Sequence, residues 1–158
     1  MTGEPATTTT RTSRVIAALP EALYEAFIDP DALVAWLPPA EMTGRMHRFD
    51  ARVGGGYRMT LRYPPTERTF HGKSSDAEDV VDVRFVELTP PRRIVEAVSF
   101  VTTDPAFAGA MTLTVTLEPV TGGTEVTLAF EKLPPGLRPE DNDAGARLSL
   151  EQLARRFE

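Results

Sequence analysis

The sequence predicts an α+β fold in which one antiparallel sheet of about six to seven strands is covered by a single long C-terminal helix. Apolar and polar residues alternate in several separate runs through the middle of the chain, which is the pattern of strands with one buried face. No long helical pattern separates these runs, so the crossovers that a parallel sheet needs are missing. The 158 residues, 41% of them apolar, suffice for one domain with a real core.

The chain is expected to begin with a disordered tail over residues 1–10, followed by a single domain over residues 11–158. The tail is polar, contains four consecutive threonines and shows no apolar periodicity. Alternation begins at Ser13, and Val15, Ala17 and Leu19 mark the apolar side of a first strand.

Two short helices are expected directly after this strand. Pro20 suits the first position of a helix, and apolar residues follow it at helical spacing as far as Phe27. The Asp-Pro pair at 29–30 ends this helix, and Asp31 is expected to cap the second one. The prolines at 38–39 end the second helix.

The middle of the chain is predicted to consist of strands joined by tight turns. The clearest alternation runs over residues 57–63, after a glycine triplet at 54–56 that is expected to form a hairpin turn. Residues 66–79 are polar and are expected to form a loop with one short strand around Phe70. The remaining strands place these residues on their apolar faces: Val81, Val83, Phe85; Ile94, Glu96, Val98, Phe100; Met111, Leu113, Val115, Leu117; and, after a turn at Gly122 and Gly123, Val126, Leu128, Phe130.

The last segment of the chain is predicted to be the long helix. Asp141 or Asn142 is a suitable cap. One apolar stripe follows at helical spacing, made of Ala146, Leu150, Leu153, Ala154 and Phe157.

Five short phrases occur in a fixed order between Thr12 and Glu158: PEALYEAF at 20–27, LVAWL at 33–37, VGGGYR at 53–58, ELTPPRRI at 87–94 and GTEVTL at 123–128. In this order they resemble the START-like superfamily, also called the SRPBCC or helix-grip fold, and within it the heat-shock-protein-90 ATPase activator homologue family. The resemblance implies a curved antiparallel sheet that grips the C-terminal helix around a deep cavity. It does not imply one activity, because the fold hosts binders, transporters and a few cyclases.

The implied cavity would be lined by the apolar face of the sheet and by the second short helix. Tyr and Trp carry a polar tip that needs a partner when buried, and Met adapts to irregular shapes, so such a lining suits a mostly apolar ligand pocket. A solid core built from the same residues is the alternative. The expected lining residues are Trp36 near the mouth, Tyr57, Met59, Tyr63, Phe85, Phe100 and Met111.

Arg147 is also a candidate ligand contact, since it aligns with a position where relatives often carry a cavity-facing Trp. A guanidinium at a cavity mouth would hold an acidic or polar ligand. The alternative is an ion pair on the helix surface, because Asp143 and Glu151 each lie four residues from Arg147.

No catalytic group, metal site or cofactor site is predicted. The chain has no Cys and two His, which supplies neither a thiolate nor a His-based triad. His47 is expected to face solvent on a strand that places Arg45 and Phe49 on the same face. His71 is expected in a solvated loop, where Asp76, Glu78 and Asp79 are near in sequence but not fixed.

The net charge of −6 argues against nucleic acid and anionic membranes as partners. A group of arginines on two neighbouring strands is therefore read as an ordinary wet sheet face: Arg45, Arg48, Arg52, Arg58 and Arg62. No apolar run approaches the roughly 18 residues of a membrane span, and the N-terminus lacks a targeting signal, so a cytoplasmic location is expected.

The function predicted from these observations is the binding of a small hydrophobic or amphipathic molecule in the cavity. Two alternatives stay open. The family resemblance allows a co-chaperone-like interaction module whose partner is a chaperone. The fold also allows an enzyme of the polyketide cyclase or aromatase kind, which shapes a chain inside the cavity.

Overall fold

The computed structural model describes residues 8–64 and 78–158 and confirms the α+β class. The first helix, the hairpin turns and the apolar faces of β3 to β7 lie where the sequence predicts them, but β1 buries Thr12 and Ile16, so the prediction that Val15 and Leu19 mark its apolar side is wrong. In chain order the elements are β1 (Thr9–Ile16), α1 (Pro20–Ile28), α2 (Pro30–Trp36), β2 (Thr43–Asp50), β3 (Gly56–Arg62), β4 (Glu78–Thr89), β5 (Arg93–Phe100), the 3-10 helix η1 (Pro105–Phe107), β6 (Ala110–Val120), β7 (Gly123–Glu131) and α3 (Pro139–Arg156).

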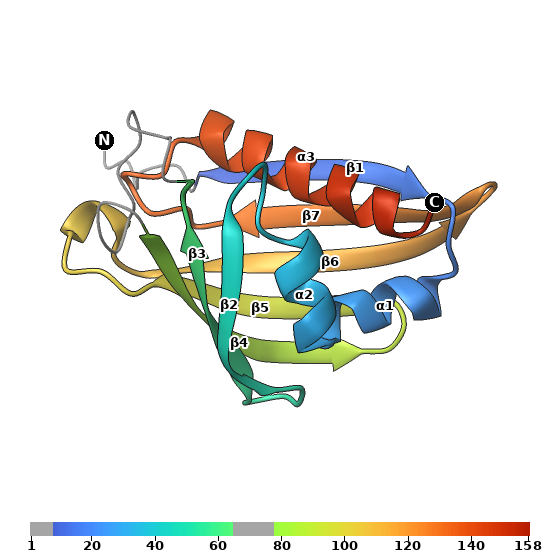
Figure 1. Ribbon diagram of the computed structural model, residues 1–158, viewed down its shortest axis with the longest axis horizontal. Helices are drawn as coiled ribbons and strands as arrows, with labels where there is room; N and C mark the ends of the chain where they lie inside the picture. The colour runs from blue at the N-terminus through green and yellow to red at the C-terminus, as the bar shows by residue number, and fades with distance from the viewer. Residues whose placement is uncertain (1–7, 65–77) are drawn as a thin grey trace, which may run out of the picture.

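The strands form one antiparallel sheet in the order β1-β7-β6-β5-β4-β3-β2. Each strand from β2 to β6 pairs with its successor in the chain, and β1 closes the row beside β7. The sheet curls, so that β2 and β3 cross in front of the other strands while α3 lies along β1 (Figure 1). This is the predicted curved sheet around a C-terminal helix.

β1 begins four residues earlier than the sequence suggests and takes in the end of the expected tail. Thr9 pairs with Glu131 and Thr10 with Phe130. The side chain of Asn142 on α3 also donates a hydrogen bond to the Thr10 hydroxyl, at 2.8 Å. β-branched threonines suit an extended strand, so the threonine run continues the sheet. Residues 1–7 lie outside the described residues.

The caps of α2 and α3 differ from the predicted ones. Asp29, not Asp31, caps α2, because its carboxylate accepts hydrogen bonds from the backbone amides of Asp31 and Ala32 at 2.9 and 3.4 Å. α3 starts at Pro139, with Arg138 as its flanking residue, so the expected caps at 141–142 lie inside its first turn. In both helices a proline occupies the first position, which suits its fixed φ and missing N–H.

A β-bulge in β2 changes which residues share a face. The register against β3 shifts between Met46 and Arg48, so His47 is an extra residue and the alternation reverses after it. His47 is exposed, as predicted, and bonds the Thr60 hydroxyl at 2.7 Å. Phe49 instead turns inward and stacks on Tyr57, with ring centroids 5.6 Å apart. The expectation that Phe49 shares the face of His47 is therefore wrong.

Three arginines of β2 and β3 make ion pairs on the outer face of the sheet. Arg48 and Arg58 both contact Asp82, at 2.7 and 3.0 Å, and Arg62 contacts Glu78 at 2.6 Å. The hydrogen bond from Arg58 is the main reason that the pKa of Asp82 is lowered. Ion pairs between exposed side chains are typical of a solvated sheet face, which is what the sequence predicts for these arginines.

Gly123, at the start of β7, allows a close approach between β7 and the end of β1. A Cβ on Gly123 would lie 2.0 Å from the carbonyl oxygen of Ile16, and its φ is +147°. We expect Gly123→Ala to lower the free energy of unfolding by about 1–3 kcal/mol, because backbone must move to admit the methyl group. Denaturant titration measures this.

Gly145→Ala is the matched control, since a Cβ on Gly145 in α3 meets no atom within 4 Å. Alanine is favoured over glycine in a helix by about 1 kcal/mol, so this variant should be as stable as the parent or more stable. Equal stability of both alanine variants would show that the β1–β7 contact adapts without strain.

Candidate functional site

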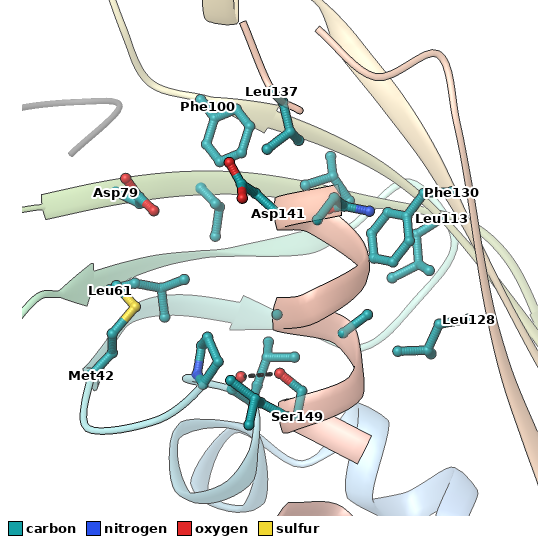
Figure 2. A pocket seen from close by; sticks show the side chains of 18 of the residues that line it. Met42, Leu61, Asp79, Phe100, Leu113, Leu128, Phe130, Leu137, Asp141 and Ser149 are labelled. Carbon is teal, nitrogen blue, oxygen red and sulfur yellow. Dashed lines mark hydrogen bonds between the residues drawn. The ribbon is translucent and has the colours of Figure 1, made fainter. Parts of the chain in front are cut away.

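A cavity of about 870 Å³ lies between the inner face of the sheet and α3. Its size is within the range of small-molecule sites. Figure 2 shows the strand side chains Leu113, Leu128 and Phe130 on one side of α3, and Met42, Leu61 and Asp79 on the other. The walls contributed by the sheet and helices are mostly apolar: Phe27, Leu33, Trp36, Tyr57, Leu61, Val81, Val83, Glu96, Val98, Phe100, Met111, Leu113, Leu128, Phe130, Ala146 and Ser149.

The exposed members of the lining mark the opening. They include Ala40 and Glu41 in the loop after α2, and Arg138, Asp141 and Leu148 in and before α3. The α2–β2 loop is fixed to α3 by hydrogen bonds, for example from the Ser149 hydroxyl to the Leu37 carbonyl oxygen at 2.7 Å. The cavity therefore opens between this loop and the N-terminal half of α3.

The structure brings most of the predicted lining residues to this cavity. Met59 and Phe85 are exceptions: both have 0% exposure and neither is part of the wall. Phe85 packs against the rings of Phe49 and Tyr57, each at a centroid distance of 6.0 Å, so it belongs to the solid core. The predicted residues that do line the cavity are Trp36, Tyr57, Tyr63, Phe100 and Met111.

Trp36 lines the cavity from the inner end and not from the mouth. Its side chain is 1% exposed, and its indole Nε1 donates to the backbone oxygen of Ala26 at 2.8 Å. Its ring meets the edge of Phe27 at a centroid distance of 4.8 Å. The indole N–H needs a partner when buried, and the end of α1 supplies one. This contact draws Trp36 inward, so the expected position near the mouth is wrong.

Arg147 does not line the cavity. Its guanidinium Nε donates to Asp143 at 2.8 Å, and its side chain is 70% exposed. Asp143 also accepts a hydrogen bond from the Thr12 hydroxyl, and these two bonds, that of Thr12 first, lower the pKa of Asp143. The structure therefore has the surface ion pair that the sequence analysis gave as the alternative. The predicted position of Arg147 facing the cavity is wrong.

Glu96 is a candidate site residue to which the sequence analysis gave no role. It lies on β5 between the buried Ile94 and Val98, is 3% exposed, and reaches the cavity wall. Among the described residues, no hydrogen-bond donor or cation contacts its carboxyl group. Burial alone raises the pKa of Glu96 to about 8. The sequence does contain a signal for this residue, because an acidic side chain occupies a position on the apolar face of a predicted strand.

The hydroxyl of Tyr57 lies within electrostatic reach of Glu96. Burial raises the pKa of Tyr57 well above its usual value, and the negative charge of Glu96 raises it further. Tyr57 therefore stays neutral and offers the cavity a hydroxyl group as a second polar group. Together the phenol and the carboxyl give an otherwise apolar wall the means to orient a ligand.

A second acid, Asp79, reaches the cavity wall from the start of β4. It is buried, and its Oδ2 accepts a hydrogen bond from Tyr63 at 3.0 Å. Burial, and then the charge of Asp79, raise the pKa of Tyr63. Because β4 starts at Glu78, the last two residues of the predicted loop belong to the sheet. His71 and the short strand predicted around Phe70 lie outside the described residues.

Two further expectations concern metals and membranes. Within residues 8–64 and 78–158, no group of three or more His, Cys, Asp or Glu side chains is arranged to hold a metal ion. In the same part of the chain, no helix has the length and apolar character needed to cross a bilayer.

Comparison with known proteins gives one family and several similar structures. The model of the family described as Activator of Hsp90 ATPase homolog 1-like protein matches residues 17–158. A crystal structure of a protein from Chromobacterium violaceum is 34% identical, with a TM-score of 0.81, over 96% of this chain and 98% of that chain. A protein from Rhizobium loti is 26% identical, with a TM-score of 0.68, over 94% and 96%.

A protein from Rhodobacter sphaeroides is 23% identical, with a TM-score of 0.74, over 94% of this chain and 91% of that chain, and this likeness concerns the fold alone. No curated protein matches the chain.

Proposed function

The chain belongs to the Activator of Hsp90 ATPase homolog 1-like family of START-like proteins, and from this premise we propose that it binds a small hydrophobic or amphipathic molecule between the sheet and α3. The observation that supports this most is the cavity of about 870 Å³, which has apolar walls, an opening at the surface and a buried carboxyl group. We assign this binding to the cytoplasm, the location expected from the sequence.

An apolar space of this size is unlike ordinary packing. Protein interiors are close-packed, and voids larger than a water molecule are few. Water inside this cavity would find few partners along walls such as those made by Val81, Val98 and Leu128. A ligand that displaces this water gains about 25 cal/mol for each Å² of apolar surface it buries. The cavity therefore favours an occupant with a large apolar body.

Gly145 provides a way to test the cavity without altering the sheet. It lines the cavity, and a Cβ there meets no atom within 4 Å. Gly145→Leu should place a side chain in the ligand's space while improving the helix, since Leu has the higher helix propensity. We expect the parent protein to retain or bind apolar compounds, seen by native mass spectrometry and by a higher melting temperature, and Gly145→Leu to bind none.

The size of the effect follows from mass action. A ligand at one hundred times its Kd stabilises the folded protein by about 2.7 kcal/mol. Gly145→Ala is the control and should still bind, because one methyl group leaves most of the cavity free. Equal binding by the parent and Gly145→Leu would place the compounds elsewhere on the protein and contradict the proposal.

A second candidate function is suggested by the description of the family, which names activation of an Hsp90 ATPase. In this case the chain would act by contacting a chaperone and not by holding a ligand. Adding the purified protein to an Hsp90 ATPase assay tests it: stimulation that survives in Gly145→Leu would favour the chaperone role over cavity binding.

A further inference from the structure

The charged groups around the cavity are mostly acidic. Among the described residues, four carboxylic acids belong to its lining, namely Glu41, Asp79, Glu96 and Asp141. The one basic residue of that lining is Arg138, whose Nε pairs with Glu140 at 3.1 Å. A cavity with this balance attracts cations and repels anions.

Glu96 lies deepest in the fold among these acids. β5 is the fourth of seven strands in the sheet, and Glu96 pairs there with Phe85 of β4 and Leu113 of β6. A carboxylate in such surroundings carries a large desolvation cost unless a cation or several donors compensate it. The described residues supply no such partner, so the carboxyl group is available to whatever occupies the cavity.

The electrostatics of the surroundings point the same way. Burial makes the charged form of Glu96 unfavourable in the empty protein, which is why its pKa is raised. A positive charge placed beside it would restore the carboxylate and gain a charge-assisted hydrogen bond in a site of low dielectric constant. An anion in the same space would instead make the charged form of Glu96 still less favourable.

We propose that the cavity binds an amphipathic amine, whose protonated nitrogen contacts the carboxylate of Glu96 and whose apolar body fills the space between the sheet and α3. The inference rests on the proposed function and names its ligand class. It also reverses the preference for acids that a cavity-facing Arg147 would have produced, because Arg147 pairs with Asp143 outside the cavity.

Three probes with the same chain and different head groups test this: decylamine, decanol and decanoic acid, at about pH 9, where the folded parent carries the Glu96 carboxylate. Calorimetry gives the affinities, and the fluorescence of Trp36, the only Trp in the chain and a wall residue, reports entry into the cavity. We expect the amine to bind about tenfold more tightly than the alcohol and the acid to bind most weakly, because the amine brings a positive charge to the Glu96 carboxylate and the acid brings a second negative charge.

Glu96→Gln keeps the size of the side chain and removes its charge. In this variant the amine should lose its advantage, while the affinity for decanol changes less than about threefold, since the apolar contacts are kept. Glu118→Gln is the control, because it removes the same charge from an exposed position on β6 that is not part of the cavity wall. It should leave the preference for the amine intact.

The outcomes separate the inference from the proposed function. If all three probes bind the parent protein equally, or if Glu96→Gln keeps the amine's advantage, the amine inference fails while cavity binding stands. A loss of preference in Glu118→Gln as large as in Glu96→Gln would show an effect of net charge, which also overturns the inference. If no probe binds the parent, or if Gly145→Leu binds them all as well, the proposed function itself fails.

Discussion

Glu96→Gln should raise the free energy of unfolding of the ligand-free protein at about pH 9 by up to about 5 kcal/mol. The carboxyl group has an ordinary pKa of 4.5, and burial raises the pKa of Glu96 to about 8 in the folded protein. At 1.36 kcal/mol per pKa unit, this difference corresponds to the stated free energy.

The direction of the pH dependence follows from proton binding. Below about pH 4.5 both states of the parent are protonated at Glu96, so its burial carries no charge penalty. Between about pH 4.5 and pH 8 the unfolded chain releases this proton while the folded protein retains it, so stability falls as the pH rises. Above about pH 8 the folded protein also carries the charge, and the loss is complete.

Denaturant titrations at about pH 5, pH 7 and pH 9 measure this effect. The difference between Glu96→Gln and the parent should be small at the lowest pH and grow steadily. Tyr57, the titratable group that faces Glu96, stays neutral over this range because its pKa is raised well above 10. Glu118→Gln, which replaces a carboxylate at an exposed position on β6, is the matched control. A pH-independent difference for Glu96→Gln would mean that the carboxyl group is solvated in the folded state.

The alternation of residues predicts the strands and, from β3 onward, their buried faces, but it does not predict which buried residues reach a cavity. Met59 and Met111 are both Met residues on the inner side of a strand, yet Met59 is enclosed in the core and Met111 lines the open space. The difference depends on which elements cover each strand, and α2 packs against β2, the neighbour of β3. The curvature of the sheet is set by pairing across all of its strands, so the sequence of one strand does not predict it.

Two other corrections have the same origin in long-range contacts. The bulge at His47 becomes visible only when β2 is aligned against β3, because an extra residue is defined by its partner strand. Trp36 turns inward because the backbone oxygen of Ala26 accepts its N–H, which requires knowing how α1 meets α2. Glu96 is the converse case: the sequence places it on a buried face, but a role for it emerges only with the cavity.

Leu153→Ala should lower the free energy of unfolding by about 2–5 kcal/mol. Leu153 has 0% exposure and belongs to the buried stripe of α3, together with Leu150 and Ala154. Truncation removes apolar contacts and leaves a space that the curved sheet cannot close, because its strands are held by their own ladders. Thermal and denaturant unfolding measure the loss.

Leu148→Ala is the matched control on the same helix. Leu148 is 39% exposed at the opening of the cavity, so truncating it should change the free energy of unfolding by less than about 1 kcal/mol. The comparison separates the two faces of α3: the buried stripe holds the helix on the sheet, and Gly145 and Leu148 border the cavity. Equal stability of both variants would mean that α3 does not need its buried stripe to cover the sheet. A cavity wall held so loosely could not discriminate among ligands.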